Sequence, residues 1–249
     1  MKTKLASGLI LGLLMMANVS GAAHTSPLTP NNERVAITIG VYNYAHAKSG
    51  LLFEAQQTAT AILLKAGVEA RWLSCPTDHA STRIPACAAT ADPTHLTLRI
   101  LPGSMSSRSQ RVSADTLGFA VIGEELSCDA WVLYDRARDF AAQRQLTLAS
   151  LLGSAIAHEL GHLFLGDSFH SKAGLMRARW SDKEFLAMER GELIFSVAES
   201  QRIQKAVIAR RQTSSATNAE ALSSDSRTSG SSTLVTAATN AAEGASAQQ

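Results

Sequence analysis

Aromatic residues and an excess of one sign of charge are both lacking in this 249-residue chain. Aromatic side chains make up 5% of the residues, and the formal net charge is +2 at pH 7. No stretch combines dense Lys and Arg with interleaved aromatic residues, which is the pattern of a nucleic-acid-binding surface. We therefore expect no nucleic-acid partner. The 45% of hydrophobic residues is enough for one medium-sized domain with its own core.

Cysteine is scarce as well, since the chain has three, at Cys75, Cys87 and Cys128. An odd number leaves one thiol without an intramolecular partner. Cys75 and Cys87 flank a short segment that contains Pro76 and Pro85, so we predict a disulfide between them. Cys128 is then expected to be a free thiol at the start of a strand.

Hydrophobic runs approaching the ~20 residues of a membrane span are absent. The nearest is an apolar run over residues 5–16, which follows Lys2 and Lys4 and precedes small residues at 20–23. A positive start, a short apolar run and small residues are typical of a secretory signal peptide. We predict a signal peptide over residues 1–23 and a secreted or periplasmic protein. An uncleaved membrane anchor is the less favoured alternative, because the run is too short.

The hydrophobic periodicity predicts an α/β (α+β) fold, with a mixed sheet of about five strands. The strands are expected at residues 34–42, 68–74, 94–101, 117–122 and 130–134. Helices are expected at residues 50–66, 148–165, 181–190 and 196–211, and residues 136–146 form either a helix of their own or the approach to the helix at 148–165. The first strand, helix and second strand form a βαβ unit, so these two strands should be parallel.

The domain boundaries follow from composition. We place one folded domain at residues 24–211. Residues 212–249 are dominated by Ser, Thr, Ala, Asn and Gly, with little apolar area to bury, and are predicted to be a disordered tail. The nearly all-round apolar helix at 148–165 is expected to pass through the centre of the domain.

One motif with metal-binding chemistry stands in that central helix. His158, Glu159 and His162 form the pattern H-E-x-x-H, and His170 follows. Residues i and i+4 share one face of a helix, so His158 and His162 can bind one metal ion from consecutive turns. Glu159 then lies beside the metal, where it can take a proton from a bound water. The residue types predict one catalytic zinc ion.

The stretch from His158 to Met176 resembles the metzincin clan of zinc metallopeptidases, whose motif H-E-x-x-H-x-x-G-x-x-H or -D is followed by a Met-turn. In this sequence Gly174-Leu175-Met176 resembles the Met-turn. The resemblance covers roughly residues 34–180 and implies a twisted sheet with a long active-site helix. It implies that Met176 forms a floor beneath the three imidazoles. It also implies that the strand containing Gly118, Phe119 and Ala120 is an edge strand that pairs with an extended substrate.

The spacing after His162 departs from the metzincin pattern. The glycine, Gly166, comes one residue late, and Ser168 stands where the third histidine would fall. His170 is the favoured third ligand, because the loop after Gly166 can absorb two residues. Asp167 is the second choice. A glutamate on the helix at 181–190, either Glu184 or Glu189, is the third.

These observations predict a secreted zinc metalloendopeptidase that acts on peptides or proteins as a monomer, with Glu159 as general base. The alternative is a non-catalytic binding protein that keeps zinc as a structural element, although such a protein has no need of Glu159. Trp180 stands where many metzincins have a tyrosine after the Met-turn. The isolated histidines His46, His79 and His95 are expected at the surface or in loops.

Overall fold

The structure, a computed structural model, describes residues 35–78, 84–88, 92–103, 116–122 and 128–228. Within these ranges five strands form one sheet, in the order β2-β1-β3-β5-β4. β2, β1, β3 and β5 run parallel to one another, and β4 is antiparallel to β5. The strands are β1 (Val35–Asn43), β2 (Val68–Cys75), β3 (His95–Leu101), β4 (Gly118–Ile122) and β5 (Cys128–Leu133).

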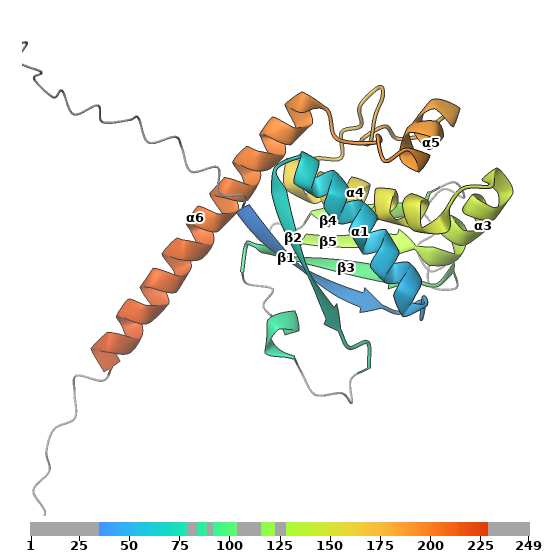
Figure 1. Ribbon diagram of the computed structural model, residues 1–249. Helices are drawn as coiled ribbons and strands as arrows, with labels where there is room; N and C mark the ends of the chain where they lie inside the picture. The colour runs from blue at the N-terminus through green and yellow to red at the C-terminus, as the bar shows by residue number, and fades with distance from the viewer. Residues whose placement is uncertain (1–34, 79–83, 89–91, 104–115, 123–127, 229–249) are drawn as a thin grey trace, which may run out of the picture. The chain divides into compact units, whose positions relative to one another are not determined.

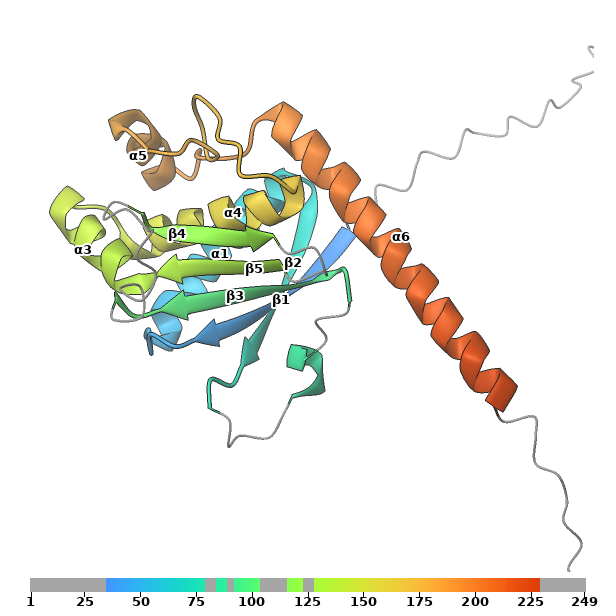
Figure 2. The ribbon, with the colours of Figure 1, turned by 180° about the vertical axis from the view of Figure 1, so that it is seen from behind.

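The described residues also form five α-helices and one turn of 3-10 helix, η1 (Pro85–Ala88). The helices are α1 (Ser49–Lys65), α3 (Tyr134–Arg144), α4 (Leu148–Leu165), α5 (Asp182–Glu189) and α6 (Val197–Thr228). α1, α3 and α4 lie on one face of the sheet, as the two opposite views in Figures 1 and 2 show. The predicted mixed α/β fold and the parallel pairing of β1 with β2 are therefore confirmed.

The core lies between the sheet and α4, because both present apolar side chains to the same space. β1 and β3 contribute alternate residues such as Ile39 and Leu98, and α4 contributes Leu152, Ile156 and Leu160, all fully buried. The sequence-based expectation that only residues 5–16 approach the length of a membrane span was wrong, because α4 is long and apolar enough to cross a membrane by length and composition. However, 83% of this helix is buried inside the protein. It is therefore the central core helix that its sequence predicted.

α4 approaches α1 very closely at one position. A methyl group added at Gly153 would lie 2.5 Å from the backbone oxygen of Ala55 and 2.5 Å from Cβ of Thr58. No side chain fits at those distances, so glycine is required for the two helices to pack at this separation. This contact sets the distance between α4 and α1.

A disulfide joins Cys75, the last residue of β2, to Cys87 in η1, with their Cα atoms 5.8 Å apart. Tyr42 on β1 also holds this segment, since its hydroxyl donates a hydrogen bond to the Cys87 carbonyl. The pair is the one predicted from the sequence. Cys128 begins β5, but its side chain lies outside the described part, so its predicted free thiol is not described.

One of the two possibilities left open for residues 136–146 is realised, and one boundary differs from the sequence-based expectation. Residues 136–146 largely belong to a separate helix, α3, which ends at a left-handed Gln145. α6 does not end at residue 211 but continues to Thr228, so residues 212–228 are helical where a disordered tail was predicted. The predicted signal peptide and residues 229–249 lie outside the described residues.

Candidate metal centre

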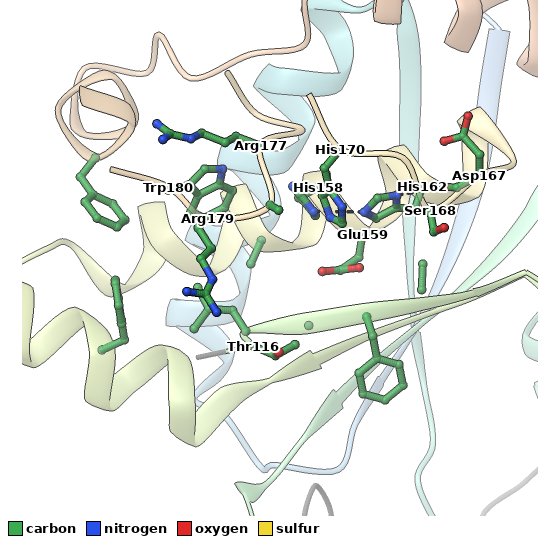
Figure 3. Close-up of a pocket in the computed structure, with 18 of the residues that line it drawn as sticks. Thr116, His158, Glu159, His162, Asp167, Ser168, His170, Arg177, Arg179 and Trp180 are labelled. Carbon is green, nitrogen blue, oxygen red and sulfur yellow. Dashed lines mark hydrogen bonds between the residues drawn. The ribbon is translucent and has the colours of Figure 1, made fainter. Parts of the chain in front are cut away.

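Three histidines from two elements come together at the C-terminal end of α4. His158 and His162 lie on consecutive turns of the helix, and Gly166 ends it with a left-handed φ of 70°. The chain then turns back and brings His170 beside them, so that one nitrogen from each ring lies within 4.8 Å of the others. Figure 3 shows the three rings converging from α4 and the following loop.

The hydrogen bonds of two rings fix which nitrogen faces the cluster. Nδ1 of His158 lies 2.7 Å from the Leu175 carbonyl oxygen, and Nδ1 of His162 lies 3.0 Å from the Asp167 carbonyl oxygen. A carbonyl oxygen can only accept, so each Nδ1 carries the proton and donates it. Each Nε2 is then left with a lone pair that is directed at the other ring.

The two Nε2 atoms lie 3.2 Å apart. Two lone pairs at this distance repel each other unless a cation lies between them. Burial lowers the pKa of His158 to about 4 and also lowers the pKa of His162, so both rings are neutral at neutral pH. Neutral imidazoles with converging Nε2 atoms are the donors that zinc and other transition metals bind in proteins. The three histidines thus fit a metal ion.

Glu159 lies between α4 and β4. Its side chain is 6% exposed, and burial raises the pKa of its carboxyl to about 8. Space for it exists because β4 begins with glycine. A Cβ on Gly118 would lie 2.8 Å from Oε1 of Glu159 and 2.6 Å from the Trp131 carbonyl oxygen. Gly118, on the strand expected to pair with a substrate, therefore leaves room for the Glu159 carboxyl group.

Met176 lies beneath the helix, next to the histidines. It is buried, and a Cβ added to Gly161 would approach its Sδ to 2.7 Å. Gly174 has a left-handed φ of 81°, which allows the turn that leads into this contact. The same turn directs the Leu175 carbonyl at both Nδ1 of His158 and Nε1 of Trp180. The turn therefore orients the His158 ring through the Leu175 carbonyl and packs Met176 against Gly161 of α4.

The alternative third ligands have other partners. The Asp167 carboxylate pairs with Arg202 at 2.7 Å, although its carbonyl contacts His162. Glu184 closes a capping box with Ser181 and pairs with Arg177 at 2.7 Å, and Glu189 accepts hydrogen bonds from Thr147. None of these carboxylates belongs to the described cluster of possible metal ligands, which consists of the three histidines.

A cavity of about 670 Å³ opens beside the histidines. Its lining includes the predicted edge-strand residues Gly118, Phe119 and Ala120, together with Glu159. β4 is an edge strand of the sheet, as expected. Phe119 also stacks on Trp131 of β5, with ring centroids 5.6 Å apart.

The sequence did not indicate the far wall of this cavity. Phe140 and Arg144 reach it from α3, and Phe185 reaches it from α5. Their residue types are ordinary for amphipathic helices, and no motif connects segments 40 residues apart, so no signal was available. Trp180, noted from its position after Met176, does line the cavity.

One histidine was placed wrongly from the sequence. His95 is 6% exposed rather than at the surface, because it begins β3 and its ring covers Gly40 on β1. Its Nε2 would lie 2.9 Å from a Cβ at Gly40, beside Sγ of Cys75. His46 is exposed in a loop as predicted, and His79 lies outside the described residues.

Comparison with protein-family models and with curated proteins finds no match for this chain. The resemblance to metzincins therefore depends on the residues themselves. The structure adds a mixed α/β fold and three histidines that are positioned to hold a metal ion.

Proposed function

We propose that this chain is an exported zinc-dependent peptidase of the metzincin type. The observation that supports this most is the arrangement of His158 and His162, whose unprotonated Nε2 atoms face each other at 3.2 Å with His170 beside them. Three converging imidazoles next to an open cavity match a catalytic zinc site, in which three protein ligands leave one position for water or substrate.

Zinc held by these residues supplies a Lewis acid that lowers the pKa of water and polarises a substrate carbonyl. Glu159 is the group of the chain that moves protons. It lines the cavity, and among the described residues no side chain or backbone group donates a hydrogen bond to its carboxyl oxygens. Burial with no cation beside it raises the pKa of this carboxyl to about 8. A cation held by the three histidines would favour the carboxylate form, which would take a proton from the attacking water and deliver it to the leaving amine.

The main-chain carbonyls of Leu175 and Asp167 keep the two helical imidazoles in the correct tautomer throughout the reaction. Each accepts the Nδ1 proton of one ring. Partners of this kind orient metal-binding histidines and increase their basicity. Both carbonyls lie in the loop that follows α4, so this loop acts with the helix as a single unit.

The substrate proposed is an extended peptide that pairs with β4. Among the described residues this strand has β5 on one side and no strand on the other, so its outer edge can offer main-chain hydrogen bonds to a peptide. Four of its residues, Gly118, Phe119, Ala120 and Ile122, line the cavity. A peptide added here would run past Glu159 and the three histidines.

Export is part of the proposal. The disulfide between Cys75 and Cys87 supports it, because such bonds persist in oxidising compartments outside the cytosol. The short basic and apolar stretch at residues 1–16 is the sequence feature that would direct it.

The test compares the wild type with Glu159→Gln, after both have been loaded with zinc. Metal content is measured by elemental analysis, and hydrolysis is measured on casein and on a peptide library. We expect both proteins to bind one zinc ion and Glu159→Gln to lose roughly 10²- to 10⁴-fold in rate, the usual contribution of a general base. Glu54→Gln, an exposed glutamate on α1, is the control and should match the wild type.

Zinc binding without hydrolysis of any peptide by the wild type would contradict the peptidase proposal. It would favour the alternative, a binding protein in which zinc has a structural role. A wild type that binds no zinc or other transition metal would contradict both.

A further inference from the structure

The cavity is asymmetric about the histidines. Figure 3 shows Arg179 and Trp180 on one side of the three rings, and Asp167 and Ser168 on the opposite side. The first side, called the arginine end here, is lined by Phe140, Arg144, Ala155, Arg179, Trp180 and Phe185. Its walls are apolar, and its charges are positive.

The apolar walls are packed and fixed. The rings of Phe140 and Phe185 lie 5.5 Å apart and join α3 to α5. Phe185 is 7% exposed and Ala155 is 2% exposed. This end of the cavity therefore has fixed apolar walls.

Arg144 is held over these rings. Its guanidinium carbon lies 5.6 Å from the centroid of Phe140 and 5.5 Å from that of Phe185. Cation–π contacts with two rings restrict the position of the charge without neutralising it. Its ion pair is with Asp182 at 3.0 Å, and that side chain is 92% exposed. Water screens such a pair, so the exposed Asp182 carboxylate holds Arg144 only weakly.

The other arginines of this end differ in their pairing. Arg177 is matched by the buried carboxylate of Glu184 at 2.7 Å. Arg179 is an exposed residue whose side chain extends in Figure 3 toward Thr116, at the approach to β4. The carboxylates that line the cavity are Glu159, beside the histidines, and Asp167, which pairs with Arg202 at the opposite end. Neither offsets Arg144 directly.

We infer that the arginine end binds a carboxylate of the substrate, carried on an apolar stem next to the scissile bond. This inference rests on the proposed peptidase function and names the substrates of the same site. A glutamate side chain fits this description, because its methylenes would contact the phenylalanine rings while its carboxylate meets Arg144. The C-terminal carboxylate of a peptide has the same chemistry. Arg144 is the specificity-determining residue.

The test uses quenched fluorescent peptides with an amidated C-terminus that differ only in the residues flanking the cleaved bond. Glu, Gln, Leu and Lys are compared at each flanking position. In a second set the peptide ends close to the cleaved bond, so that its free C-terminal carboxylate takes the place of the Glu side-chain carboxylate. The zinc-loaded wild type should cleave the best acidic peptide about 10-fold or more faster in kcat/KM than its Gln counterpart, as expected for a hydrogen bond to a charged group. A preference within the amidated set identifies a Glu side chain as the source of the carboxylate, and a preference for the second set identifies the C-terminus of the peptide.

Arg144→Gln should bring that ratio close to one, while it leaves the rate on the Leu peptide within a few-fold. Arg138→Gln is the matched control, because Arg138 is on the same helix with the same 51% side-chain exposure and does not line the cavity. It should keep the wild-type preference. Circular dichroism and zinc content of each variant verify that the fold and the metal site are retained.

The two proposals fail in different ways. If the wild type cleaves no peptide, the peptidase proposal is contradicted. If it cleaves peptides with equal rates for Glu and Gln at every position and with either terminus, the inference about the arginine end is wrong and the peptidase proposal stands. A preference for Glu that persists in Arg144→Gln would also overturn the assignment to this end.

Discussion

The two halves of α4 are equally buried, but different forces hold them in place. The first half, residues 148–157, contacts α1 through apolar side chains and through the close approach at Gly153. The second half, residues 158–165, contains three buried polar residues, His158, Glu159 and His162. Two of these are fixed by hydrogen bonds to carbonyls of the following loop.

The difference separates stability from function within one helix. Apolar burial in the first half stabilises the fold, whereas burying imidazole and carboxyl groups in the second half costs free energy unless partners compensate. The loop carbonyls satisfy the histidines in part, and a bound metal would satisfy the remaining nitrogens. Substitutions in the first half should therefore change the free energy of unfolding, and those in the second half should change metal binding and chemistry.

The largest effect is expected where the metal ligands are completed. His170→Ala removes one of three converging nitrogens, so zinc affinity should fall by more than ~100-fold. This loss is larger than the one expected from removing a residue that only hydrogen-bonds to a metal ligand. Asp167→Asn should retain zinc, since the Asp167 carboxylate pairs with Arg202 and the carbonyl that meets His162 is unchanged. Competition with a chromogenic chelator measures both affinities.

Zinc retained in His170→Ala and lost in Asp167→Asn would reverse the ligand assignment. Thermal unfolding of the metal-free proteins is the control, because the exposed His170 contributes little packing. Similar midpoints for the wild type and both variants are expected.

The second prediction concerns the first half of α4. Gly153→Ala places a methyl group 2.5 Å from the Ala55 carbonyl oxygen, so α1 and α4 must separate. We expect a loss of about 1–3 kcal/mol in the free energy of unfolding, as for overpacked cores. Gly50→Ala is the matched control on α1, where an added methyl meets nothing within 4 Å. It should be neutral or slightly stabilising.

Urea denaturation gives both values. Zinc affinity of folded Gly153→Ala should remain close to that of the wild type if the two halves act separately. A large loss of zinc affinity together with stability would show that the position of α1 governs the metal site, and the comparison would fail.

The sequence predicted what local patterns determine. The sequence predicted the strand β1, the helix α1 and the strand β2 in this order. Two strands joined by a crossover helix pair in parallel, as β1 and β2 do. The i and i+4 spacing of His158 and His162 determines their shared face whatever surrounds α4. The disulfide between Cys75 and Cys87 followed from their short separation.

Features that depend on contacts between distant segments were not predicted. The burial of His95 results from the register of β3 on β1, which places its ring over Gly40. The cavity wall formed by Phe140 and Phe185 needs the packing of α3 on α5. The extension of α6 to Thr228 was missed for another reason, since low apolar content argues against burial but not against helix formation, and no Gly or Pro interrupts residues 212–228.

The third prediction tests how β4 fixes the second half of α4. Gly118→Ala would bring a Cβ within 2.8 Å of Glu159 Oε1 and 2.6 Å of the Trp131 carbonyl oxygen. Displacement of the carboxyl group should lower kcat/KM by roughly 10- to 100-fold while zinc remains bound, because general-base catalysis depends on position. If Gly118 acts through Glu159, the double variant Gly118→Ala/Glu159→Gln should be no slower than Glu159→Gln alone. Additive losses would assign Gly118 a separate role, such as substrate binding.

The smallest effect is expected at Glu184, a buried residue of α5 that pairs with Arg177. Burial alone would raise the pKa of Glu184, but hydrogen bonds from Ser181 and the Arg177 guanidinium outweigh it and lower the pKa to about 2. A folded-state pKa below the ordinary 4.5 means that the carboxylate stabilises the fold above about pH 4.5 and that this contribution is lost as the pH falls toward 2.

Glu184→Gln, which also breaks the capping box, should cost about 0.5–2 kcal/mol at pH 7 and progressively less as the pH approaches 2. Urea denaturation at pH 7, 4 and 2.5 measures this difference, and the exposed Glu192→Gln provides the baseline. A difference between wild type and Glu184→Gln that stays constant across the three pH values would show that the carboxylate charge is not what holds Arg177.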